Sequence, residues 1–563
     1  MIDLNAKPFY LDDNDIEWVH STIRDMTLEE KIGQLFCPIA EQINVNKLID
    51  MNVGGIMYLP RQAAEIREKY SRIQTKSKIP FLLAANTEYG GIGVTTDGTN
   101  FGKPMQVAAT DEEEQAYRLG LVACSETAAI GGNWSFAPVI DIDKNFLNPI
   151  TNVRTYGSDA DRVLRMAKQF FRGAKEAEIA VSIKHFPGDG VDDRDQHLHV
   201  TVNSLSVEEW SASYGHLYKE LIEDGAQTVM IGHIAQPAWA KKLNPHLSEK
   251  ELFLPATLSK ELLQGLLRKE CSFNGMIVSD ATTMLGFMNA MPRKYAIPEC
   301  IMCGVDMFLF NTNLDEDYAY MLGGYKEGLL TDKRLEEALT RILGLKASLK
   351  LHIKQKEGKL VPNASALKAL RCERHLQWAK DCADKSVTLV KDTACLLPIT
   401  PQTHPRIALL SMESEGRAGD TGGCADALKK ELESLGFAVD EPDDLHYLNV
   451  PDPPMIEDIK KRYDLIVYCF NLQTVSNQTA VRLNWKQFSN CPFPWLVTEI
   501  PTIAVSFANP YHLYDAPEFK TYINAYAQNE YTVRAVAEKI TGKSKFTGRS
   551  PVDAFCGKKE CTF

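Results

Sequence analysis

Two apolar runs in this sequence end in residues that can transfer a proton or attack an electrophilic carbon. The run AVSI leads into Lys184–His197, KHFPGDGVDDRDQH, which offers Asp195 and His197 two positions apart. A second run, GMIVSD, ends in the lone carboxylate Asp280. Cleavage of a glycosidic bond with retention needs a nucleophile on one face of the anomeric carbon and a proton donor near the leaving oxygen. We therefore predict that the two strand ends meet at one rim and form a sugar-cleaving site.

Asp280 is the predicted nucleophile. It follows three apolar residues and one serine, which places it at the mouth of a barrel, where it is accessible for reaction. The same residue also suits the N-cap of the following helix-like stretch, ATTMLGFMNAM, because Asp is a preferred N-cap residue. Position alone leaves both roles open.

His197 is the predicted acid/base, and Asp195 is the carboxylate that orients its ring. The alternative is a hydrated acidic loop, because four Asp residues crowd the span from 189 to 195. A third interpretation makes Asp195, His197 and His199 ligands of zinc or manganese. No distant ligand set of matching spacing accompanies them, so we predict no metal and no cofactor.

Several polar residues are candidates for binding sugar hydroxyls. Lys184 and His185 end a strand of buried type, where an unpaired Lys is costly and therefore rarely structural. Arg154, in NPITNVRTYGSD, has forked donors that grip hydroxyls, and a surface ion pair with Asp159 or Asp161 is the equally good alternative. A glycine-rich loop follows the strand that ends at Asn86, but its spacing fits neither phosphate-binding fingerprint.

The elements that must position these residues alternate between short apolar runs and longer helix-like stretches. The runs between residues 50 and 345 are GGIMYLP, FLLAAN, NWSFAPVIDI, AVSIKHF, TVMIGHI, GMIVSD and GVDMFLFN. Continuous apolar runs of this length are typical of buried parallel strands joined by crossover helices. This pattern predicts an N-terminal (β/α)8 TIM-like barrel, in which the carboxyl ends of the strands carry the active site. The polar residues at those ends include Asn86, Asp141, Lys184, His185, His233 and Asp280.

The rest of the chain predicts a second, smaller domain. At 563 residues the chain exceeds what one hydrophobic core usually serves. We predict a barrel over 1–345, a helical linker over 346–384 and a C-terminal α/β sandwich domain with an open sheet over 385–563.

Composition and charge limit the classes of partner. Lys and Arg number 62 against 74 Asp and Glu, a net charge of −12, which argues against nucleic acid as a partner. The N-terminus shows no signal-peptide pattern and no run of 18 apolar residues follows, so we predict a cytoplasmic protein without a membrane partner. The 13 cysteines are odd in number and scattered, which favours reduced thiols. The sequence indicates a small carbohydrate substrate and does not indicate an oligomeric state.

Several motifs resemble glycoside hydrolase family 3, and within it the β-N-acetylglucosaminidase branch. The opening DMTLEEKIGQLF, the blocks APVIDI and NVRTYGSD, and the run KHFPGDG are similar to the family's characteristic blocks. SVTLVKD and the closing KFTGRSPV are similar more loosely. The resemblance implies sugar-binding roles for Arg154, Lys184 and His185, a His acid/base assisted by Asp at His197 and Asp195, and the nucleophile at Asp280.

Two departures from the branch bear on the substrate. Asp189 stands where the branch usually has His, and Asn86 with TEYGG stands where it usually has D-Q-E-G-G. The second motif is implicated in binding a remote sugar hydroxyl, so the gluco or galacto configuration of the hexosamine stays open.

The resemblance implies a retaining, exo-acting, metal-independent β-N-acetylhexosaminidase that cleaves terminal N-acetylglucosamine-type residues through a covalent glycosyl-aspartate. A neutral imidazole base does not repel an approaching anion, so a β-N-acetylhexosaminide phosphorylase is one alternative. A β-glucosidase is another, and a non-catalytic sugar-binding protein is a third.

Overall fold

The computed structural model describes residues 2–41, 43–414, 423–445, 454–485 and 492–563, and the chain divides into two compact units. Unit 1 consists of Met1–Asn100, Ala116–Asn145 and Ala160–His375. Unit 2 consists of Phe101–Gln115, Phe146–Asp159 and Leu376–Phe563. Two short excursions from the predicted barrel domain therefore belong to unit 2, and much of the predicted linker belongs to unit 1.

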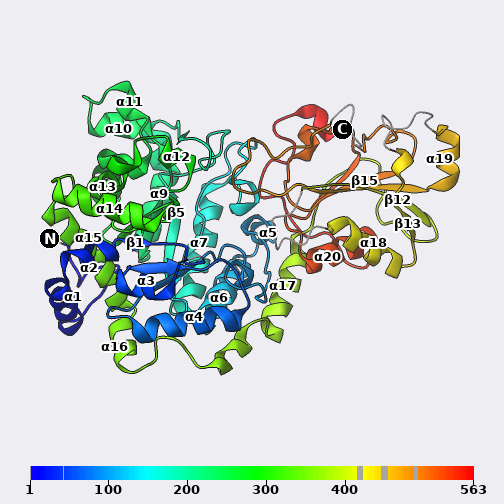
Figure 1. Ribbon diagram of the computed structural model, residues 1–563. Coiled ribbons are helices and arrows are strands. Elements are labelled where there is room, and N and C mark those ends of the chain that lie inside the picture. Colours follow the sequence, from blue (N-terminus) through cyan, green and yellow to red (C-terminus); the bar gives the residue numbers. More distant parts are fainter. Residues whose placement is uncertain (1, 42, 415–422, 446–453, 486–491) are drawn as a thin grey trace. The chain divides into compact units, whose positions relative to one another are not determined.

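A curled parallel sheet forms the centre of unit 1 (Figure 1). Its six strands run in the order β2-β3-β4-β5-β7-β9, and a separate parallel pair joins β1 to β10. Single parallel bridges link Ile39 to Met57 and Val278 to Met307, so the pair connects the two edges of the sheet. The strands are β1 (Phe36–Cys37), β2 (Gly55–Met57), β3 (Leu82–Ala85), β4 (Trp134–Ser135), β5 (Ala180–Phe186), β7 (Thr228–Ile231), β9 (Met276–Ser279) and β10 (Phe308–Leu309), with a small outer pair β6 (Thr201–Val202) and β8 (Ile234–Ala235).

The strands β2, β3, β4, β5, β7, β9 and β10 form where the apolar runs were predicted, because their residues are buried. All seven residues of β5 are buried, and the ring of Trp134 donates from Nε1 to Thr228 Oγ1 at 3.0 Å across the interior. A parallel sheet covered on its outer face needs such continuous apolar runs. The α/β class is thereby confirmed, and the carboxyl ends of the strands gather at one end of unit 1.

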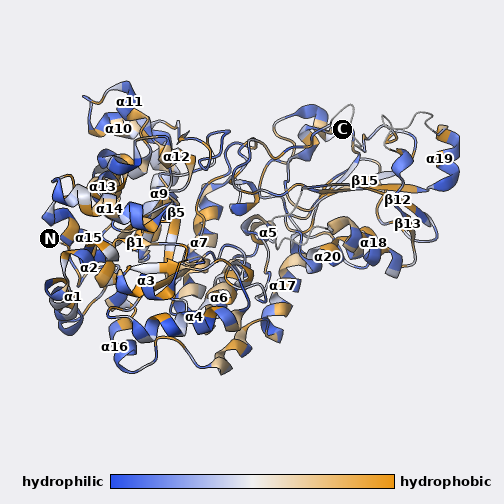
Figure 2. Cartoon of the chain, in the orientation of Figure 1, coloured by the Kyte–Doolittle hydropathy of each residue, from blue (hydrophilic) through white to orange (hydrophobic). Residues whose placement is uncertain are grey.

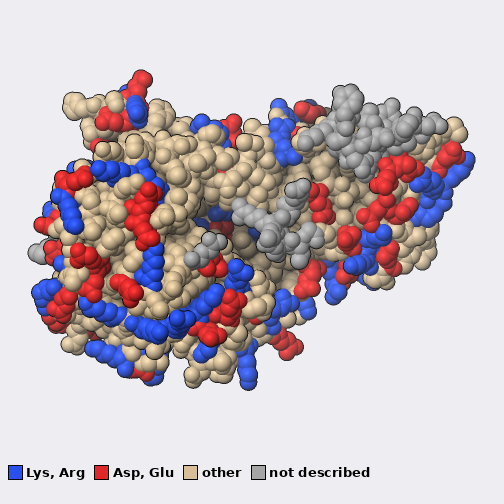
Figure 3. Space-filling view, in the orientation of Figure 1, with Lys and Arg blue, Asp and Glu red and all other residues tan. Residues whose placement is uncertain are grey.

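Helices surround this sheet and present their polar faces outward (Figure 2). The helices α1, α2, α8 and α11 begin at a capping box, as Thr27 and Glu30 show for α2, because the first backbone N–H groups of a helix need acceptors. Acidic and basic side chains lie beside one another over the visible face of unit 1 (Figure 3), with ion pairs such as Lys78 to Glu30. The helices are α1 (Asp13–Asp25), α2 (Leu28–Gln34), α3 (Val45–Asp50), α4 (Ala63–Lys76), α6 (Glu113–Ala129), α7 (Ala160–Glu176), α8 (Val207–Ala212), α9 (Tyr214–Glu223), α10 (Pro237–Leu243), α11 (Glu249–Leu252), a π-helix (Glu261–Glu270), α12 (Leu285–Met288), α13 (Arg293–Cys303), α14 (Leu314–Lys326), α15 (Asp332–Ser348) and α16 (Leu351–Lys356).

A buried charged cluster lies at the opposite end of the strands from the predicted site. Asp306 precedes β10 and accepts from Arg268 Nη2 and Arg334 Nη2, each at 2.7 Å, and from the backbone N–H of Ile277 at 2.8 Å. Arg341 Nη1 lies 3.4 Å from the same carboxylate. One buried carboxylate therefore compensates three largely buried guanidinium groups.

Unit 2 is built on a second, mixed sheet in the order β11-β16-β15-β14-β12-β13. Only the pairing of β11 with β16 is antiparallel among the described strands of this sheet. One face packs against α18 (Cys424–Ser434) and α20 (Glu530–Ile540), and the other against α19 (Ile456–Arg462) and the segments around it. The strands are β11 (Thr388–Asp392), β12 (Arg406–Glu413), β13 (Ala438–Asp440), β14 (Leu465–Asn471), β15 (Thr502–Ser506) and β16 (Thr521–Asn524).

Two further described α-helices are α5 (Pro104–Ala109) in unit 2 and α17 (Glu373–Ser386), which leads into it. Among the described helices of both units, none is both long and apolar enough to cross a membrane.

Candidate active site

Asp280 follows β9, and its carboxylate lies among three imidazole rings. The side chain is mostly buried, and its Oδ1 accepts from the N–H of Ala281 at 2.7 Å. Burial alone would raise the pKa of Asp280, but His185, His233 and His197 outweigh it together with that N–H, so the net pKa lies below the ordinary value. Asp280 is therefore ionised at neutral pH, the state that a nucleophile requires.

His185, in β5, lies next to Asp280 and is held by Asp141. Its Nε2 is 3.8 Å from Asp280 Oδ2, and its Nδ1 is 2.7 Å from Asp141 Oδ2. Because a carboxylate can only accept, Nδ1 carries a proton and donates it to Asp141. Asp141 Oδ1 also accepts the backbone N–H groups of His185 at 3.1 Å and Asp189 at 2.8 Å. Both oxygens of Asp141 accept hydrogen bonds that position β5 and its loop, and the sugar-binding role of Asp141 stays a prediction.

His197 and Asp195 form a hydrogen-bonded pair on the loop after β5. Asp195 Oδ1 accepts from His197 Nδ1 at 2.6 Å and from the backbone N–H of His197 at 2.8 Å. The Asp195 side chain is fully buried, whereas 20% of the His197 side chain is exposed. The carboxylate assigns the Nδ1 proton and leaves Nε2 for an external partner, the geometry expected of an oriented acid/base.

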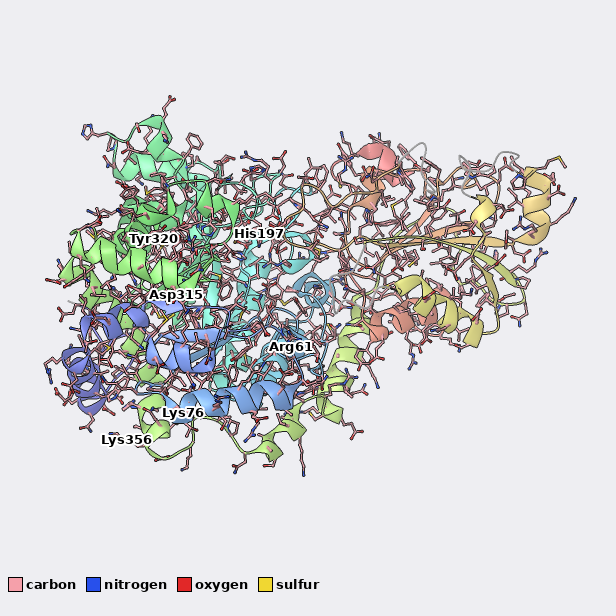
Figure 4. All side chains as sticks on the ribbon, in the orientation of Figure 1. Arg61, Lys76, His197, Asp315, Tyr320 and Lys356 are labelled. Carbon is pink, nitrogen blue, oxygen red and sulfur yellow. The ribbon has the colours of Figure 1, made fainter. Side chains whose placement is uncertain are left out.

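The site lies at one end of unit 1. His197 is well separated in Figure 4 from Lys76 on α4 and Lys356 on α16. The carbonyl of His197 accepts from the N–H of Leu285 at the start of α12, which connects its loop to the segment that follows Asp280. His199, the third member of the metal-binding alternative, is exposed. Among the described residues no group of three or more His, Cys, Asp or Glu side chains gathers in a metal-binding arrangement.

Lys184 forms a buried polar cluster with two residues that follow β3. Its Nζ lies 2.7 Å from Glu88 Oε1 and donates to Asn86 Oδ1 at 3.1 Å. Lys184 and Glu88 are each 3% exposed, whereas Asn86 is exposed. Glu88 was not among the predicted site residues, although a buried Lys calls for a carboxylate partner. The ammonium group of Lys184 therefore bridges a buried carboxylate and the amide oxygen of the exposed Asn86.

His233, after β7, is fully buried and uses both ring nitrogens inside the protein. Its Nε2 donates to the carbonyl of Ala281 at 3.0 Å, so its Nδ1 accepts from Thr257 Oγ1 at 3.1 Å. Burial lowers the pKa of His233, which keeps the ring neutral. Both ring nitrogens of His233 therefore have partners inside the protein, and its sugar-binding role stays a prediction.

Asp189 occupies the loop beneath His197. Burial, followed by the nearby Asp141 carboxylate, raises the pKa of Asp189 to about 7. The glycine that follows it, Gly190, has φ +97°, and a Cβ there would lie 2.1 Å from the carbonyl oxygen of Ile142. The backbone at Gly190 thus adopts a conformation that suits glycine and lies close to the carbonyl of Ile142.

Arg154 lies in unit 2, at the end of a short 3-10 helix, Asn152–Arg154. Its Nη1 donates to the carbonyl of Ile150 at 3.3 Å. Within unit 1 the structure brings together Asp280, His185, His197 and His233, and Asp141 and Asp195 each hold one of these rings. The sugar-binding role of Arg154 stays a prediction.

Residues 27–345 match the glycosyl hydrolase family 3 N terminal domain. The chain belongs to glycoside hydrolase family 3. It is therefore a glycosidase acting on β-linked sugars, and the family predicted from the motifs is confirmed.

Relatives within this family cover the whole chain. A Cellulomonas fimi protein named beta-N-acetylglucosaminidase/beta-glucosidase is 41% identical over 566 residues, 99% of each chain. A solved structure named beta-glucoside phosphorylase BglX is 45% identical with a TM-score of 0.93, covering 99% of each chain. A family 3 beta-N-acetylglucosaminidase from Paenibacillus sp. is 23% identical with a TM-score of 0.78, over 94% of this chain and 99% of its own, and shares the fold.

Proposed function

We propose that this family 3 enzyme is a retaining, exo-acting β-N-acetylhexosaminidase that works through a covalent glycosyl-Asp280 intermediate. The observation that carries the proposal is the combination of an ionised Asp280 with a partly exposed His197 whose Nδ1 is held by Asp195. One group can attack the anomeric carbon while the other delivers a proton to the leaving oxygen.

Each step uses one proton and one bond exchange. In the first step an Asp280 oxygen bonds to the anomeric carbon, the bond to the leaving oxygen breaks, and His197 Nε2 gives its proton to that oxygen. In the second step neutral His197 takes a proton from water, the resulting hydroxide attacks the anomeric carbon, and the bond to Asp280 breaks. Asp195 keeps the ring of His197 oriented in both steps.

The substrate class follows from the polar cluster and from the relatives. Lys184, Asn86 and Glu88 offer donors and acceptors suited to the hydroxyl groups of a terminal pyranose. Within this proposal the enzyme accepts β-N-acetylglucosaminides, and β-glucosides as a second substrate, which agrees with the name of the Cellulomonas fimi relative. A panel of aryl glycosides that differ only at C2 and C4 tests this choice.

Trapping of the intermediate tests the mechanism. A 2-deoxy-2-fluoro-β-glucoside with a dinitrophenyl leaving group slows the second step, so we expect one glycosyl adduct on the peptide that contains Asp280. Asp280→Ala should show no adduct and no turnover. His197→Ala should still be labelled, because this leaving group needs no protonation. An adduct on another residue, or a product with inverted anomeric configuration, contradicts the proposal.

Phosphorolysis is the second candidate, and the base in the site favours it. A carboxylate base would repel phosphate, whereas neutral His197 carries no negative charge. The relative named beta-glucoside phosphorylase supports the same reading. Here a phosphate oxygen bonds to the anomeric carbon of the glycosyl-Asp280 ester as the bond to Asp280 breaks, which releases a sugar 1-phosphate. Turnover in phosphate and in chloride buffer of equal ionic strength separates the candidates. Free sugar alone in phosphate buffer rules phosphorolysis out.

A further inference from the structure

Gln196, between the two members of the Asp195–His197 pair, is tied to two separate strand ends. Its Nε2 donates to Asp189 Oδ2 at 3.0 Å, and its Oε1 accepts the backbone N–H of His233 at 2.8 Å. Gln196 and Asp189 are both buried. One bond reaches the loop just after β5 and the other reaches His233, the second residue after β7, so the Gln196 side chain spans the base of the acid/base loop.

Backbone groups determine which atom donates and which accepts in each of these hydrogen bonds. The N–H of His233 can only donate, which assigns Oε1 of Gln196 to it and turns Nε2 toward Asp189. The N–H of Gly190 can only donate as well, and it points at Asp189 Oδ1 at 2.7 Å. Asp189 therefore faces two fixed donors, one on each oxygen, and only a residue with two acceptor oxygens satisfies both.

We propose that Asp189, acting through Gln196, is a positioning residue that holds the acid/base His197 in register with Asp280. This inference rests on the proposed role of His197 as acid/base. Gln196 immediately precedes His197, and the carbonyl of His197 is bonded to Leu285 beyond the nucleophile. Release of the Gln196 side chain frees the loop from the ends of β5 and β7 while the bond from Asp195 to His197 persists. The pair then moves as a body away from the leaving oxygen.

The hydrogen bond between Asp189 and Gln196 predicts that either single substitution breaks it and that exchanging the acid and the amide between the two positions restores it. Asp189→Asn keeps the volume but has one acceptor oxygen for two donors, so one bond is lost whichever way the amide turns. Gln196→Glu places two carboxylates face to face. The double variant restores these three hydrogen bonds: Asn at 189 accepts from Gly190 and donates to Glu at 196, which accepts from His233. Asp193→Asn is a matched control, because it is the same substitution at an exposed position of the same loop.

The test compares two β-N-acetylglucosaminides, an aryl glycoside with dinitrophenol as leaving group and an alkyl glycoside with a simple alcohol as leaving group. We expect Asp189→Asn and Gln196→Glu each to reduce kcat/KM about 10- to 100-fold for the alkyl glycoside and less than about 5-fold for the dinitrophenyl glycoside. The double variant should return to within about 5-fold of the parent, and Asp193→Asn should match the parent. A role in folding alone would lower kcat/KM for both substrates by the same factor.

His197→Ala, measured beside these variants, separates this proposal from the one on which it rests. If His197→Ala shows the leaving-group dependence and Asp189→Asn does not, the positioning role is refuted and the acid/base role stands. If His197→Ala lacks that dependence, the acid/base role is itself wrong. A double variant no better than either single variant also refutes the exchange. Should Asp189→Asn fail to fold, Gln196→Met breaks the same link from the other side and is judged by the same two substrates.

Discussion

Replacement of Asp141 gives the sharpest test of how the site is held together. Its carboxylate accepts three N–H groups, from the backbone of His185, the backbone of Asp189 and the ring of His185. The residue is 1% exposed, so water does not readily replace it. Each buried donor left without a partner costs about 1–3 kcal/mol. We therefore expect Asp141→Ala, which leaves three donors without this partner, to lower the free energy of unfolding by about 3–9 kcal/mol, a large part of the total for a folded protein.

Asp141→Asn separates the backbone contacts from the ring contact. The Asn oxygen still accepts both backbone N–H groups, because they share Oδ1. Its NH2 group then faces Nδ1 of His185, so the ring must move its proton to Nε2, the nitrogen next to Asp280. We expect a loss of only about 1–2 kcal/mol in stability. The accompanying loss in kcat/KM should be out of proportion to it.

Urea unfolding followed by tryptophan fluorescence measures both variants, with activity recorded alongside to mark the transition of unit 1. Free energies of unfolding for the two variants within about 0.5 kcal/mol of one another would show that the shared acceptor oxygen contributes nothing to stability. So would an Asp141→Ala variant with the stability of the parent.

The remaining predictions concern charge and backbone. Labelling of Asp280 by the dinitrophenyl 2-fluoroglycoside should keep its rate as the pH falls through about 4, the ordinary carboxyl pKa, because the net pKa of Asp280 is lowered; a midpoint at or above that value contradicts the ionised nucleophile. Asp306→Asn should cost about 3–5 kcal/mol of stability at neutral pH. Burial raises the pKa of Asp306, but three arginines lower it by more, so the net pKa lies below the ordinary value. The ionised carboxylate therefore stabilises the fold above the pKa of the unfolded chain, and this contribution is lost as the pH falls. The deficit measured by urea unfolding should accordingly shrink below pH of about 4. Lys184→Met should raise KM about 10-fold or more with little change in melting temperature if Nζ binds substrate, whereas a large loss of melting temperature would assign it to pairing with Glu88. Gly190→Ala should lower the melting temperature by several degrees and also lower kcat, because its Cβ meets the carbonyl of Ile142; unchanged kcat would show that the turn does not position the loop.

The sequence predicted the strands of unit 1 well because burial on both faces leaves a continuous apolar run. It missed β1, Phe36–Cys37, because two residues are too short for any period to appear. It also placed 101–115 and 146–159 in the barrel domain, whereas they belong to unit 2. What places them there is contact with distant residues, such as the bond from Gln106 Nε2 to Thr532 Oγ1. No local pattern reports a contact across so many intervening residues.

The candidate site was predicted to the extent that its residues lie at strand ends. Asp280, His197 and Asp195 needed no more than that rule and the spacing of the pair. Glu88 was missed because it lies beyond the strand end at Asn86, and only its pairing with Lys184 identifies it. A strand-end rule locates polar side chains but does not count how many of their atoms the protein itself uses.

The number of ring nitrogens that the protein itself uses distinguishes three histidines that all lie near strand ends in the sequence. His233 bonds a carbonyl with one nitrogen and a hydroxyl with the other, so it is fully used. His185 bonds Asp141 and turns its remaining nitrogen toward Asp280. Only His197 combines a carboxylate partner with a nitrogen that faces outward.

The partner of each ring then decides what a substitution does. The carboxylate that holds His185 also accepts backbone N–H groups from two residues, so its loss reaches the fold of β5 and the loop that follows. The carboxylate that holds His197 accepts both the ring Nδ1 and the backbone N–H of that residue through the same oxygen, Oδ1. An Asn side chain keeps such an oxygen, so Asp195→Asn should melt closer to the parent than Asp141→Ala does and should reduce turnover of alkyl glycosides most. A variant that melts early instead would mean that Asp195 supports the loop as Asp141 supports the strand.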